Sequence, residues 1–193
     1  MLHGGTSLSL RRNMAKRAVF LDRDGTLIEE KNYLHQPEQV VIYPGSGKAL
    51  KELADAGYLL IMVTNQSGVG RGFFTLDDVE KVHVHIGQEL ARDGAHIVKT
   101  YIAAEHPDKP SRGRKPSPQF LFDARDEFGL DLSQCYMIGD KLIDLECGWN
   151  AGVRKSLLVR TGYGAKVERE PGVEKAVVMD DLSAAAAWIL AQN

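Results

Sequence analysis

The stretch Ala18-Val-Phe-Leu-Asp22-Arg-Asp24-Gly-Thr26-Leu decides the fold of this chain. An apolar run leads directly into two aspartates spaced i, i+2, and a glycine follows them. Such side chains in a strand point to the same side, so Asp22 and Asp24 can converge on one small site. Two carboxylates that close repel each other unless a cation or a shared proton compensates their charge. The pair is therefore interpreted as catalytic or metal-binding, with Mg²⁺ as the first candidate ion.

The Asp-x-Asp-Gly run also allows two simpler interpretations, an ordinary turn and the start of a calcium loop. A calcium loop needs a third acidic or Asn ligand just before its glycine and a Glu about six residues beyond it. Here Gly25 follows Asp24 directly, which excludes the calcium loop. The turn stays open on this stretch alone.

Composition indicates a globular protein with a sizeable core. The chain has 193 residues, of which 44% are hydrophobic and 26% charged, and is most simply one domain over residues 17–193. Its 24 Lys and Arg against 26 Asp and Glu give a formal charge of −2 without a long basic block, which argues against nucleic acid as the main partner. Cys135 and Cys147 form no Cys-x-x-Cys pair, so neither a disulfide framework nor a cysteine-rich zinc site is expected, in keeping with a reducing cytoplasm.

The first 16 residues are rich in Gly, Ser and Arg and lack a sustained apolar region. They are interpreted as a disordered leader rather than a signal peptide, with Met14 as a possible natural start. No apolar run approaches the roughly 18 residues of a membrane span, so no membrane partner is expected.

Apolar and amphipathic segments alternate along the chain. Strands are predicted over residues 17–22, 58–64, 98–103, 135–139, 156–159 and 176–179, and helices over residues 45–56, 75–93, 117–128, 142–151 and 182–191. This rhythm predicts an α/β fold, a mostly parallel sheet with helices on both faces. The polar stretch from Gly25 to Tyr43 is too short for a domain and is predicted to be a flap over the site.

Polar motifs follow the predicted strands. Asp22 and Asp24 end the first, residues 64–68 (Thr-Asn-Gln-Ser-Gly) end the second, and residues 139–141 (Gly-Asp-Lys) end the fourth. Residues 114–116 (Arg-Lys-Pro) stand just before the third helix, where they can reach the same rim. Ligands of open α/β sheets bind beyond the carboxyl ends of the strands, so these motifs are expected to share one site.

These four motifs, in this order, resemble the haloacid dehalogenase superfamily of phosphotransferases over nearly the whole chain. The resemblance implies a Rossmann-like fold with a minimal cap and a magnesium-dependent phosphomonoester hydrolase. Asp22 would be the nucleophile that forms an aspartyl-phosphate, and Asp24 the general acid and base. Thr64 and Lys115 would complete the catalytic set by binding phosphoryl oxygens. Mg²⁺ would be held by Asp22, Asp140 and the backbone carbonyl of Asp24, with Asp144 as an outer acid that orients metal-bound water.

A narrower resemblance is carried by the Arg inside the nucleophile motif, by the run from Thr64 to Gly72, and by the Arg-Lys-Pro and Gly-Asp-Lys motifs. It points to the D,D-heptose 1,7-bisphosphate phosphatase and histidinol-phosphatase branch. The substrate-binding positions that it implies are Glu30, Lys31, Asn32, Tyr33, Asn65, Gln66, Ser67, Arg71, Arg114 and Lys141. The 7-phosphate of the heptose bisphosphate is the leading substrate, and the cations at several of these positions suit a second phosphate.

Members of that branch usually carry a zinc loop with Cys-x-His before the Arg-Lys-Pro motif and Cys-x-Cys just upstream of it. Here residues 103–107 read Ala-Ala-Glu-His-Pro and residues 111–113 read Ser-Arg-Gly. His106 alone cannot build a tetrahedral site, so no zinc is expected.

Other functions stay open at this level. Histidinol phosphate is the second substrate candidate, followed by small esters such as glycerol or nucleoside monophosphates. A phosphomutase is disfavoured because it usually needs a larger cap. From other classes, a non-catalytic phosphate-binding module would have no reason to retain two repelling acids, and a nucleic-acid end-processing phosphatase would normally show a basic stripe. His83 and His85 are expected at the surface of a helix, because residues two apart on a helix point in different directions.

Overall fold

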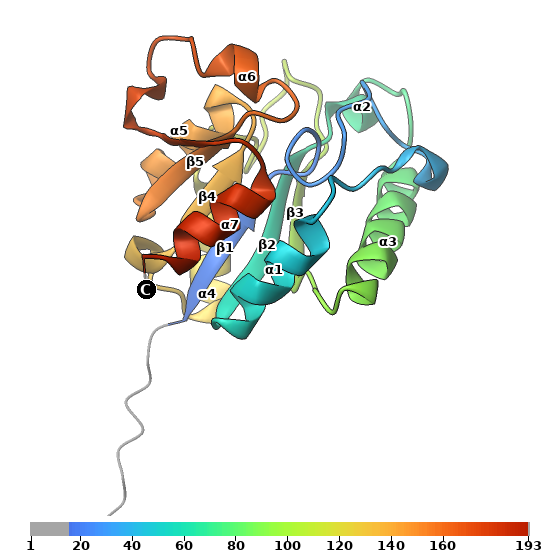
Figure 1. Ribbon diagram of the computed structural model, residues 1–193. Helices are drawn as coiled ribbons and strands as arrows, with labels where there is room; N and C mark the ends of the chain where they lie inside the picture. The colour runs from blue at the N-terminus through green and yellow to red at the C-terminus, as the bar shows by residue number, and fades with distance from the viewer. Residues whose placement is uncertain (1–15, 193) are drawn as a thin grey trace, which may run out of the picture.

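The computed structural model describes residues 16–192 and shows one six-stranded, all-parallel sheet with the strand order β3-β2-β1-β4-β5-β6 (Figure 1). The predicted α/β fold is thus confirmed. Each strand lies within one residue of its predicted bounds: β1 Arg17–Leu21, β2 Tyr58–Asn65, β3 Lys99–Ala103, β4 Tyr136–Gly139, β5 Lys155–Val159 and β6 Val177–Met179. As predicted, the last strand closes one edge of the sheet.

Five of the helices match predicted segments to within two residues: α1 Ser46–Asp55, α3 Leu76–Arg92, α4 Gln119–Phe128, α5 Leu142–Ala151 and α7 Leu182–Leu190. Two helices of a single turn escaped prediction, α2 Ser67–Gly70 and α6 Gly164–Val167, because four residues are too few to show helical periodicity. Three 3₁₀ turns complete the fold: η1 Pro37–Gln39, η2 Leu132–Gln134 and η3 Val173–Lys175.

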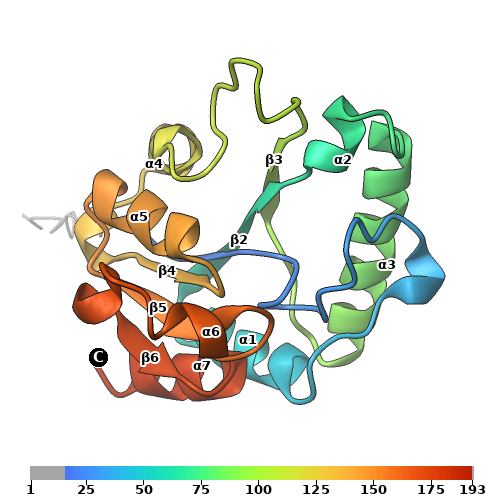
Figure 2. The ribbon, with the colours of Figure 1, turned by 90° about the horizontal axis from the view of Figure 1, so that it is seen from above.

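The helices cover both faces of the sheet because the strands alternate their side chains between two cores. Val19 and Leu21 of β1 pack with apolar residues of α1, α3 and α7. Ala18 and Phe20 of the same strand pack on the opposite face with residues of α4 and α5. The view from above separates these two helix layers (Figure 2). Since every side chain of β1 after Arg17 is buried, this strand is the rigid centre of the molecule.

The topology makes β1 the switch point of the sheet. It pairs with β2 on one side and with β4 on the other, so the two halves of the chain run outward in opposite directions from it. The carboxyl end of β1 therefore opens a crevice between the loops that follow β2 and β4. The two aspartates stand at this point.

Lys16, assigned to the leader from sequence, belongs to the fold, because its amide donates to the carbonyl of Gly129 and its carbonyl accepts from the amide of Asp131. Residues 1–15, the rest of that leader, lie outside the described residues. Among the residues that the structure describes, no helix has the length and apolarity to cross a membrane. Cys135 and Cys147 are buried free thiols, and burial raises their pKa values to about 11 and about 12.

Candidate active site

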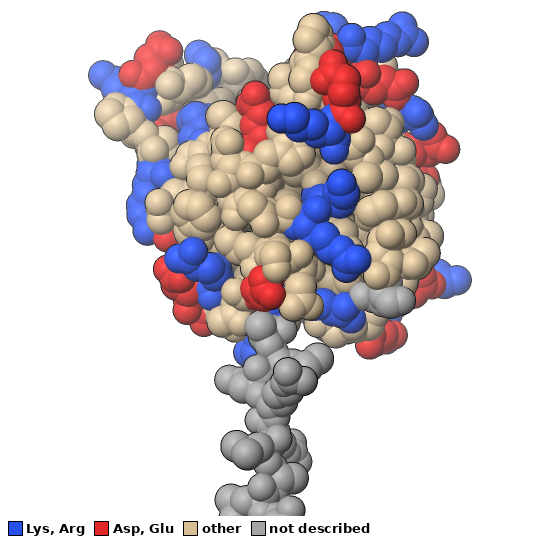
Figure 3. Space-filling view, turned by 90° about the vertical axis from the view of Figure 1, so that its left-hand side faces the viewer, with Lys and Arg blue, Asp and Glu red and all other residues tan. Residues whose placement is uncertain are grey.

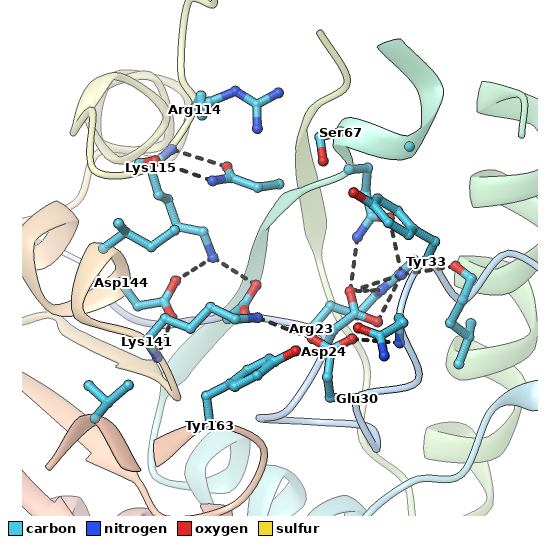
Figure 4. Close-up of a pocket in the computed structure, with 18 of the residues that line it drawn as sticks. Arg23, Asp24, Glu30, Tyr33, Ser67, Arg114, Lys115, Lys141, Asp144 and Tyr163 are labelled. Carbon is cyan, nitrogen blue, oxygen red and sulfur yellow. Dashed lines mark hydrogen bonds and ion pairs between the residues drawn. The ribbon is translucent and has the colours of Figure 1, made fainter. Parts of the chain in front are cut away.

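A cavity of about 540 Å³ lies at the carboxyl end of the sheet and collects residues from six segments (Figure 4). These segments are the end of β1, the flap, the end of β2, the turn before α4 and the loops after β4 and β5. The predicted site residues that line it are Asp22, Asp24, Glu30, Asn32, Tyr33, Asn65, Gln66, Ser67, Arg114, Lys115, Lys141 and Asp144. The four motifs expected to share a site thus meet at one cavity.

Lys115 bridges two buried carboxylates at the floor of the cavity. Its Nζ lies 2.7 Å from Oδ1 of Asp22 and 2.6 Å from Oδ1 of Asp144, and it donates to the carbonyl of Val63 at 2.8 Å. The ammonium group is 1% exposed. Burial by itself would lower the pKa of Lys115, but Asp144 and Asp22 outweigh it and raise that pKa above its usual value. Lys115 therefore carries a permanent positive charge beside the proposed nucleophile.

The position of Lys115 is set by Asn65 at the end of β2. The Asn65 amide nitrogen donates to the Lys115 carbonyl at 3.2 Å, and its amide oxygen accepts from the Lys115 backbone amide at 3.0 Å. This reciprocal pair joins two motifs that are 50 residues apart in sequence. Asn65, expected to bind substrate, thus uses its side chain to position Lys115.

Asp140, at the end of β4, is completely buried. Its Oδ2 accepts from the backbone amide of Tyr163 at 2.9 Å, and its Oδ1 has no hydrogen-bond partner among the described residues. Burial, followed by the charge of Asp22, raises the pKa of Asp140 well above its usual range. The ammonium group of Lys141 lies 3.8 Å from Oδ1, too far for a hydrogen bond, so this buried oxygen is available as a ligand for a cation.

The acidic cluster has the composition of a site for a hard divalent cation. Asp22, Asp140 and Asp144 each offer an oxygen, and these oxygens lie within 4.8 Å of one another. Gly25 and Gly162 pack against the Asp140 carboxylate so closely that a Cβ on either would overlap it. Carboxylate oxygens are the ligands that Mg²⁺ prefers, so the residues present fit this ion.

The cluster contains one acid more than the predicted ligands, because Asp144, expected in an outer role, offers an oxygen within it. The side chain of Asp24 is not part of the cluster, in keeping with the expectation that Asp24 offers its backbone carbonyl. Asp144 also accepts from the backbone amide of Lys141 at 3.0 Å in a capping box that begins α5. Asp22 and Asp24, spaced i, i+2, thus both line the cavity, as predicted. The chain turns at Asp24 and Gly25, however, so the Asp24 carboxylate faces Arg23 rather than the acidic cluster.

The Asp24 carboxylate is held by its neighbour Arg23 and by Gln66. Arg23 and Asp24 lie side by side in Figure 4. Arg23 donates to both carboxylate oxygens, at 2.9 and 3.0 Å, and the Gln66 amide donates to Oδ2 at 3.0 Å. The same Gln66 amide nitrogen donates to Oγ1 of Thr64 at 2.8 Å. Thr64, a predicted phosphate ligand, is 1% exposed and does not line the cavity.

The flap closes one side of the cavity, as predicted. Glu30 of the flap accepts from Nζ of Lys141 at 3.1 Å, and Lys141 also lies over the ring of Tyr163. Asn32 and Tyr33 both adopt positive φ angles, 42° and 59°, which places Tyr33 edge-on to Phe73 across the rim. Lys31 points away and donates to the carbonyl of Gln39, so it does not line the cavity.

Arg114 lines the cavity at the opposite end, beside the loop formed by residues 105–113. Its guanidinium donates to the carbonyl of Glu105, while its buried Nε has no partner among the described residues. Desolvation lowers the pKa of Arg114, and the nearby charge of Arg71 adds to this. Arg71 itself is exposed and is not among the residues that line the cavity.

Sequence reasoning missed several lining residues, namely Leu34, Ile143, Tyr163, Lys166, Val167 and Glu170. Most of them follow β5, whose end lacks a recognisable motif. The strand order places that end beside the end of β4, so the position of β5 in the sheet was the only available signal. His83 was also misjudged, because it is half-buried against Arg23 rather than at the surface.

Comparison with known proteins places this geometry in a family. The family described as HAD-hydrolase-like matches residues 113–185, and the family described as polynucleotide kinase 3 phosphatase matches residues 17–144. A D-glycero-β-D-manno-heptose-1,7-bisphosphate 7-phosphatase from Haemophilus ducreyi is 40% identical over 164 residues, covering 81% of this chain and 90% of the relative. The chain belongs to the HAD-like hydrolases, in the heptose-bisphosphate phosphatase family. The resemblance inferred from sequence is thereby confirmed.

Further members of this family support the match over nearly the full length. A D-glycero-D-manno-heptose-1,7-bisphosphate 7-phosphatase from Thermosynechococcus vestitus is 33% identical over 190 residues, covering 91% of this chain and 96% of the relative. The solved structure of a D,D-heptose 1,7-bisphosphate phosphatase from B. bronchiseptica, complexed with magnesium and phosphate, superposes with a TM-score of 0.86 at 30% identity. It covers 92% of this chain and 99% of that chain.

Proposed function

We propose that this protein is a magnesium-dependent phosphomonoester hydrolase that removes the 7-phosphate of D-glycero-D-manno-heptose 1,7-bisphosphate. The observation that carries the proposal is the buried Asp22–Lys115–Asp144 arrangement beside Asp140 at the floor of the cavity. It provides a nucleophile and a fixed cation where a phosphoryl group would sit. The names of the relatives support the same substrate.

The chemistry follows from the side chains that line the cavity. A carboxylate oxygen of Asp22 attacks phosphorus and forms a new P–O bond, while the bond from phosphorus to the sugar oxygen breaks. Asp24 gives a proton to that leaving oxygen. In the second half, water attacks the phosphorus of the aspartyl-phosphate, Asp24 accepts a proton from it, and the carboxylate of Asp22 is restored with release of phosphate.

Charge compensation comes from the residues around the nucleophile. Lys115 stands against Asp22 and is positioned to neutralise a phosphoryl oxygen as well. Asp22, Asp140 and Asp144 would hold Mg²⁺, which when bound supplies further compensation of phosphoryl charge. The magnesium in the B. bronchiseptica relative supports this choice of ion.

Two cationic side chains are available for a second phosphate. Arg114, with its unpartnered Nε, and Lys141, paired with Glu30, lie at two ends of the cavity. A bisphosphate can use one of them while its other phosphate lies against Lys115. Histidinol phosphate, the second candidate, carries one phosphate and would leave neither Arg114 nor Lys141 a phosphate to bind.

Nucleic acid is a further candidate, because the polynucleotide kinase 3 phosphatase family matches residues 17–144. On the face that Figure 3 shows, the side chains of Lys and Arg gather only in a short column near the middle and elsewhere lie among those of Asp and Glu. That pattern and the formal charge of −2 offer little electrostatic attraction to the phosphate backbone of a nucleic acid. It favours a small substrate.

The deciding experiment measures phosphate release with Mg²⁺ from four substrates: the heptose bisphosphate, histidinol phosphate, glycerol phosphate and a 3′-phosphorylated oligonucleotide. We expect the heptose bisphosphate to exceed the other three in kcat/KM by at least about 10²-fold. Weak and even activity across the panel would contradict the substrate but retain the phosphatase. Absence of release from all four would contradict catalysis and favour a phosphate-binding module.

A further inference from the structure

The residue between the two catalytic aspartates, Arg23, is a buried cation with an unusual set of partners. Its side chain is 1% exposed, although a guanidinium loses several kcal/mol of solvation when it is buried. Four segments supply its contacts: Asp24 after β1, Leu34 of the flap, Gln66 after β2 and His83 of α3. The chain therefore gathers an entire shell of acceptors around one arginine.

The central contact of this shell is the bidentate pair with Asp24. Nε of Arg23 donates to Oδ2 and Nη2 donates to Oδ1, and two parallel bonds of this kind define the plane of a carboxylate as well as its position. The Asp24 side chain is 15% exposed, so one part of it still reaches the cavity. Its orientation toward a bound substrate is therefore decided by Arg23.

Gln66 adds a third bond to the same carboxylate and connects it to the rest of the site. Its amide nitrogen donates to Asp24 and Thr64, and its amide oxygen accepts from Arg23 at 3.1 Å. Every polar atom of this side chain is thus satisfied within the network, and Gln66 is only 4% exposed. This leaves it few means to contact substrate, the role that sequence suggested for it.

His83 of α3 supplies the last contact of Arg23. Its Nε2 lies 3.4 Å from Nη1 of Arg23, and because arginine can only donate, the imidazole accepts there and is neutral. Burial, followed by the charge of Arg23, lowers the pKa of His83 to about 3, which agrees with a neutral ring. His83 therefore holds the guanidinium without adding a second positive charge.

From this geometry we propose that Arg23 and Gln66 are positioning residues for proton transfer: they hold the Asp24 carboxylate where it protonates the leaving oxygen. This inference rests on the proposed phosphatase function and assigns to two residues a part in it that neither the comparisons nor the sequence supplied. The alternative is a structural role, in which Arg23 and Gln66 only tie the flap and β2 together. If the residues position Asp24 for proton transfer, replacing them should slow only the esters whose leaving group needs a proton. If their role is structural, all esters should be affected alike.

The test compares two esters by kcat/KM, which reports the steps up to formation of the aspartyl-phosphate. The leaving group of glycerol phosphate is an alkoxide, which needs a proton as it departs. The leaving group of p-nitrophenyl phosphate is a stable phenolate, which does not. The variants are Gln66→Leu and Arg23→Lys, the second of which keeps the buried charge but removes the bidentate geometry. Asp24→Asn measures the full effect of losing the proton donor.

We expect each variant to lower kcat/KM for glycerol phosphate by about 10²-fold and that for p-nitrophenyl phosphate by less than about threefold. The matched control is Arg125→Lys, because Arg125 also pairs with the next residue, Asp126, but on an exposed helix face. The Arg125→Lys variant should have the wild-type kcat/KM for both esters. Circular dichroism and thermal unfolding identify any variant that fails to fold.

Equal losses with both esters in the folded variants would overturn the inference and leave a structural role. Unchanged rates with both esters would overturn it as well. A wild-type protein that releases no phosphate from the heptose bisphosphate or from either ester with Mg²⁺ would instead refute the proposed function, so the two failures are distinguishable. If Arg23→Lys does not fold, Gln66→Leu still decides the question, because it replaces an uncharged side chain and removes no buried charge.

Discussion

At the residue scale, the site is governed by charges that the protein has removed from water. Asp22, Asp140 and Asp144 stand within one small volume, and Lys115 compensates two of them. Such groups are costly to bury and are usually retained where a reaction or a metal needs them. The effect of a substitution here depends on which charge remains without a partner.

Replacing the nucleophile should separate activity from stability. Asp22→Asn retains the shape of the side chain but lacks the nucleophilic carboxylate, so we expect turnover to fall by about 10⁴-fold or more. Lys115 keeps its ion pair with Asp144, so the fold should persist. Phosphate release and circular dichroism measure the two effects. Asp126→Asn, at an exposed acid outside the cavity, is the control, and residual activity near that of the control would show that Asp22 is not the nucleophile.

His83 should make stability depend on pH. Its pKa is about 3 in the folded protein and near 6.5 in the unfolded chain, because burial and then the charge of Arg23 disfavour the imidazolium. The unfolded chain therefore binds a proton first as the pH falls. The stability contributed by neutral His83 is complete above pH 6.5 and is lost as the pH falls toward 3.

The prediction for His83 is tested with His83→Asn, which lacks the titrating ring. Between pH 7.5 and pH 5 the wild-type protein should lose up to about 2 kcal/mol more unfolding free energy than the variant. This figure is an upper bound, because solvent weakens the effect at a ring that is only half-buried. Urea unfolding at the two pH values measures this difference. Parallel losses in the two proteins would show that the ring is protonated in the folded state.

At the scale of elements, the turn formed by residues 160–163 after β5 supports the acidic cluster although it carries no acid. Gly162 lies against Gly25 and the Asp140 carboxylate, and the next residue, Tyr163, donates its amide to the same carboxylate. Thr161 also donates to the carbonyl of Gly25 at 2.6 Å. The loop thus orients Asp140 by contact and by hydrogen bonding.

Gly162→Ala should disturb this orientation. The φ of Gly162 is +56°, and an added Cβ would overlap Oδ2 of Asp140 and the backbone of Gly25. We expect the Mg²⁺ concentration for half-maximal activity to rise by about tenfold or more, as for other changes behind a metal ligand. Gly129→Ala is a matched control, because Gly129 has a φ of +68° with nothing within 4 Å of an added Cβ.

The two glycine variants share the cost of a left-handed alanine, about 1 kcal/mol of unfolding free energy. Only Gly162→Ala should change the response to Mg²⁺, which activity measured across a Mg²⁺ titration reveals. An equal response in both variants would mean that the loop after β5 does not orient the metal ligand.

The loop from Glu105 to Arg114 makes a prediction about zinc. Ser111 donates to the Glu105 carboxylate and Arg114 to the Glu105 carbonyl, so hydrogen bonds connect the two ends of the loop. Without cysteine ligands we expect the purified protein to contain no stoichiometric zinc. Elemental analysis of protein prepared in zinc-supplemented medium tests this. One equivalent of zinc that survives dialysis would contradict it.

At the scale of the whole molecule, the acidic cluster connects metal binding to global stability. An ion that binds only the folded state stabilises it by about 2.7 kcal/mol at a concentration of 100 times its Kd. Mg²⁺ should therefore raise the thermal midpoint of the wild-type protein relative to protein in EDTA. Asp140→Asn should lose this increment, whereas Asp126→Asn should keep it. An increment that Asp140→Asn retains in full would place the ion elsewhere.

Much of this protein follows from local sequence. The alternation of apolar residues in strands and helices predicted every strand to within a residue, because burial on both faces of a parallel sheet demands continuous apolar runs. Asp22, Lys115 and Asp140 were recognisable because each belongs to a short motif at a strand end or a helix start. Tyr163 and Lys166 could not be recognised, since no local pattern marks the loop that carries them.

The sequence by itself determined the fold class, the family and the residues that would carry the chemistry, because these depend on periodicity and on motifs of neighbouring residues. Only the tertiary structure decided how the acids are arranged and what each one contacts. It placed Asp144 inside the acidic cluster and turned Asp24 toward Arg23, and it joined Gln66 and His83 to that pair. The physical reason is that pairing of buried charges is settled by distances between segments that are remote along the chain, and these distances exist only once the sheet has assembled.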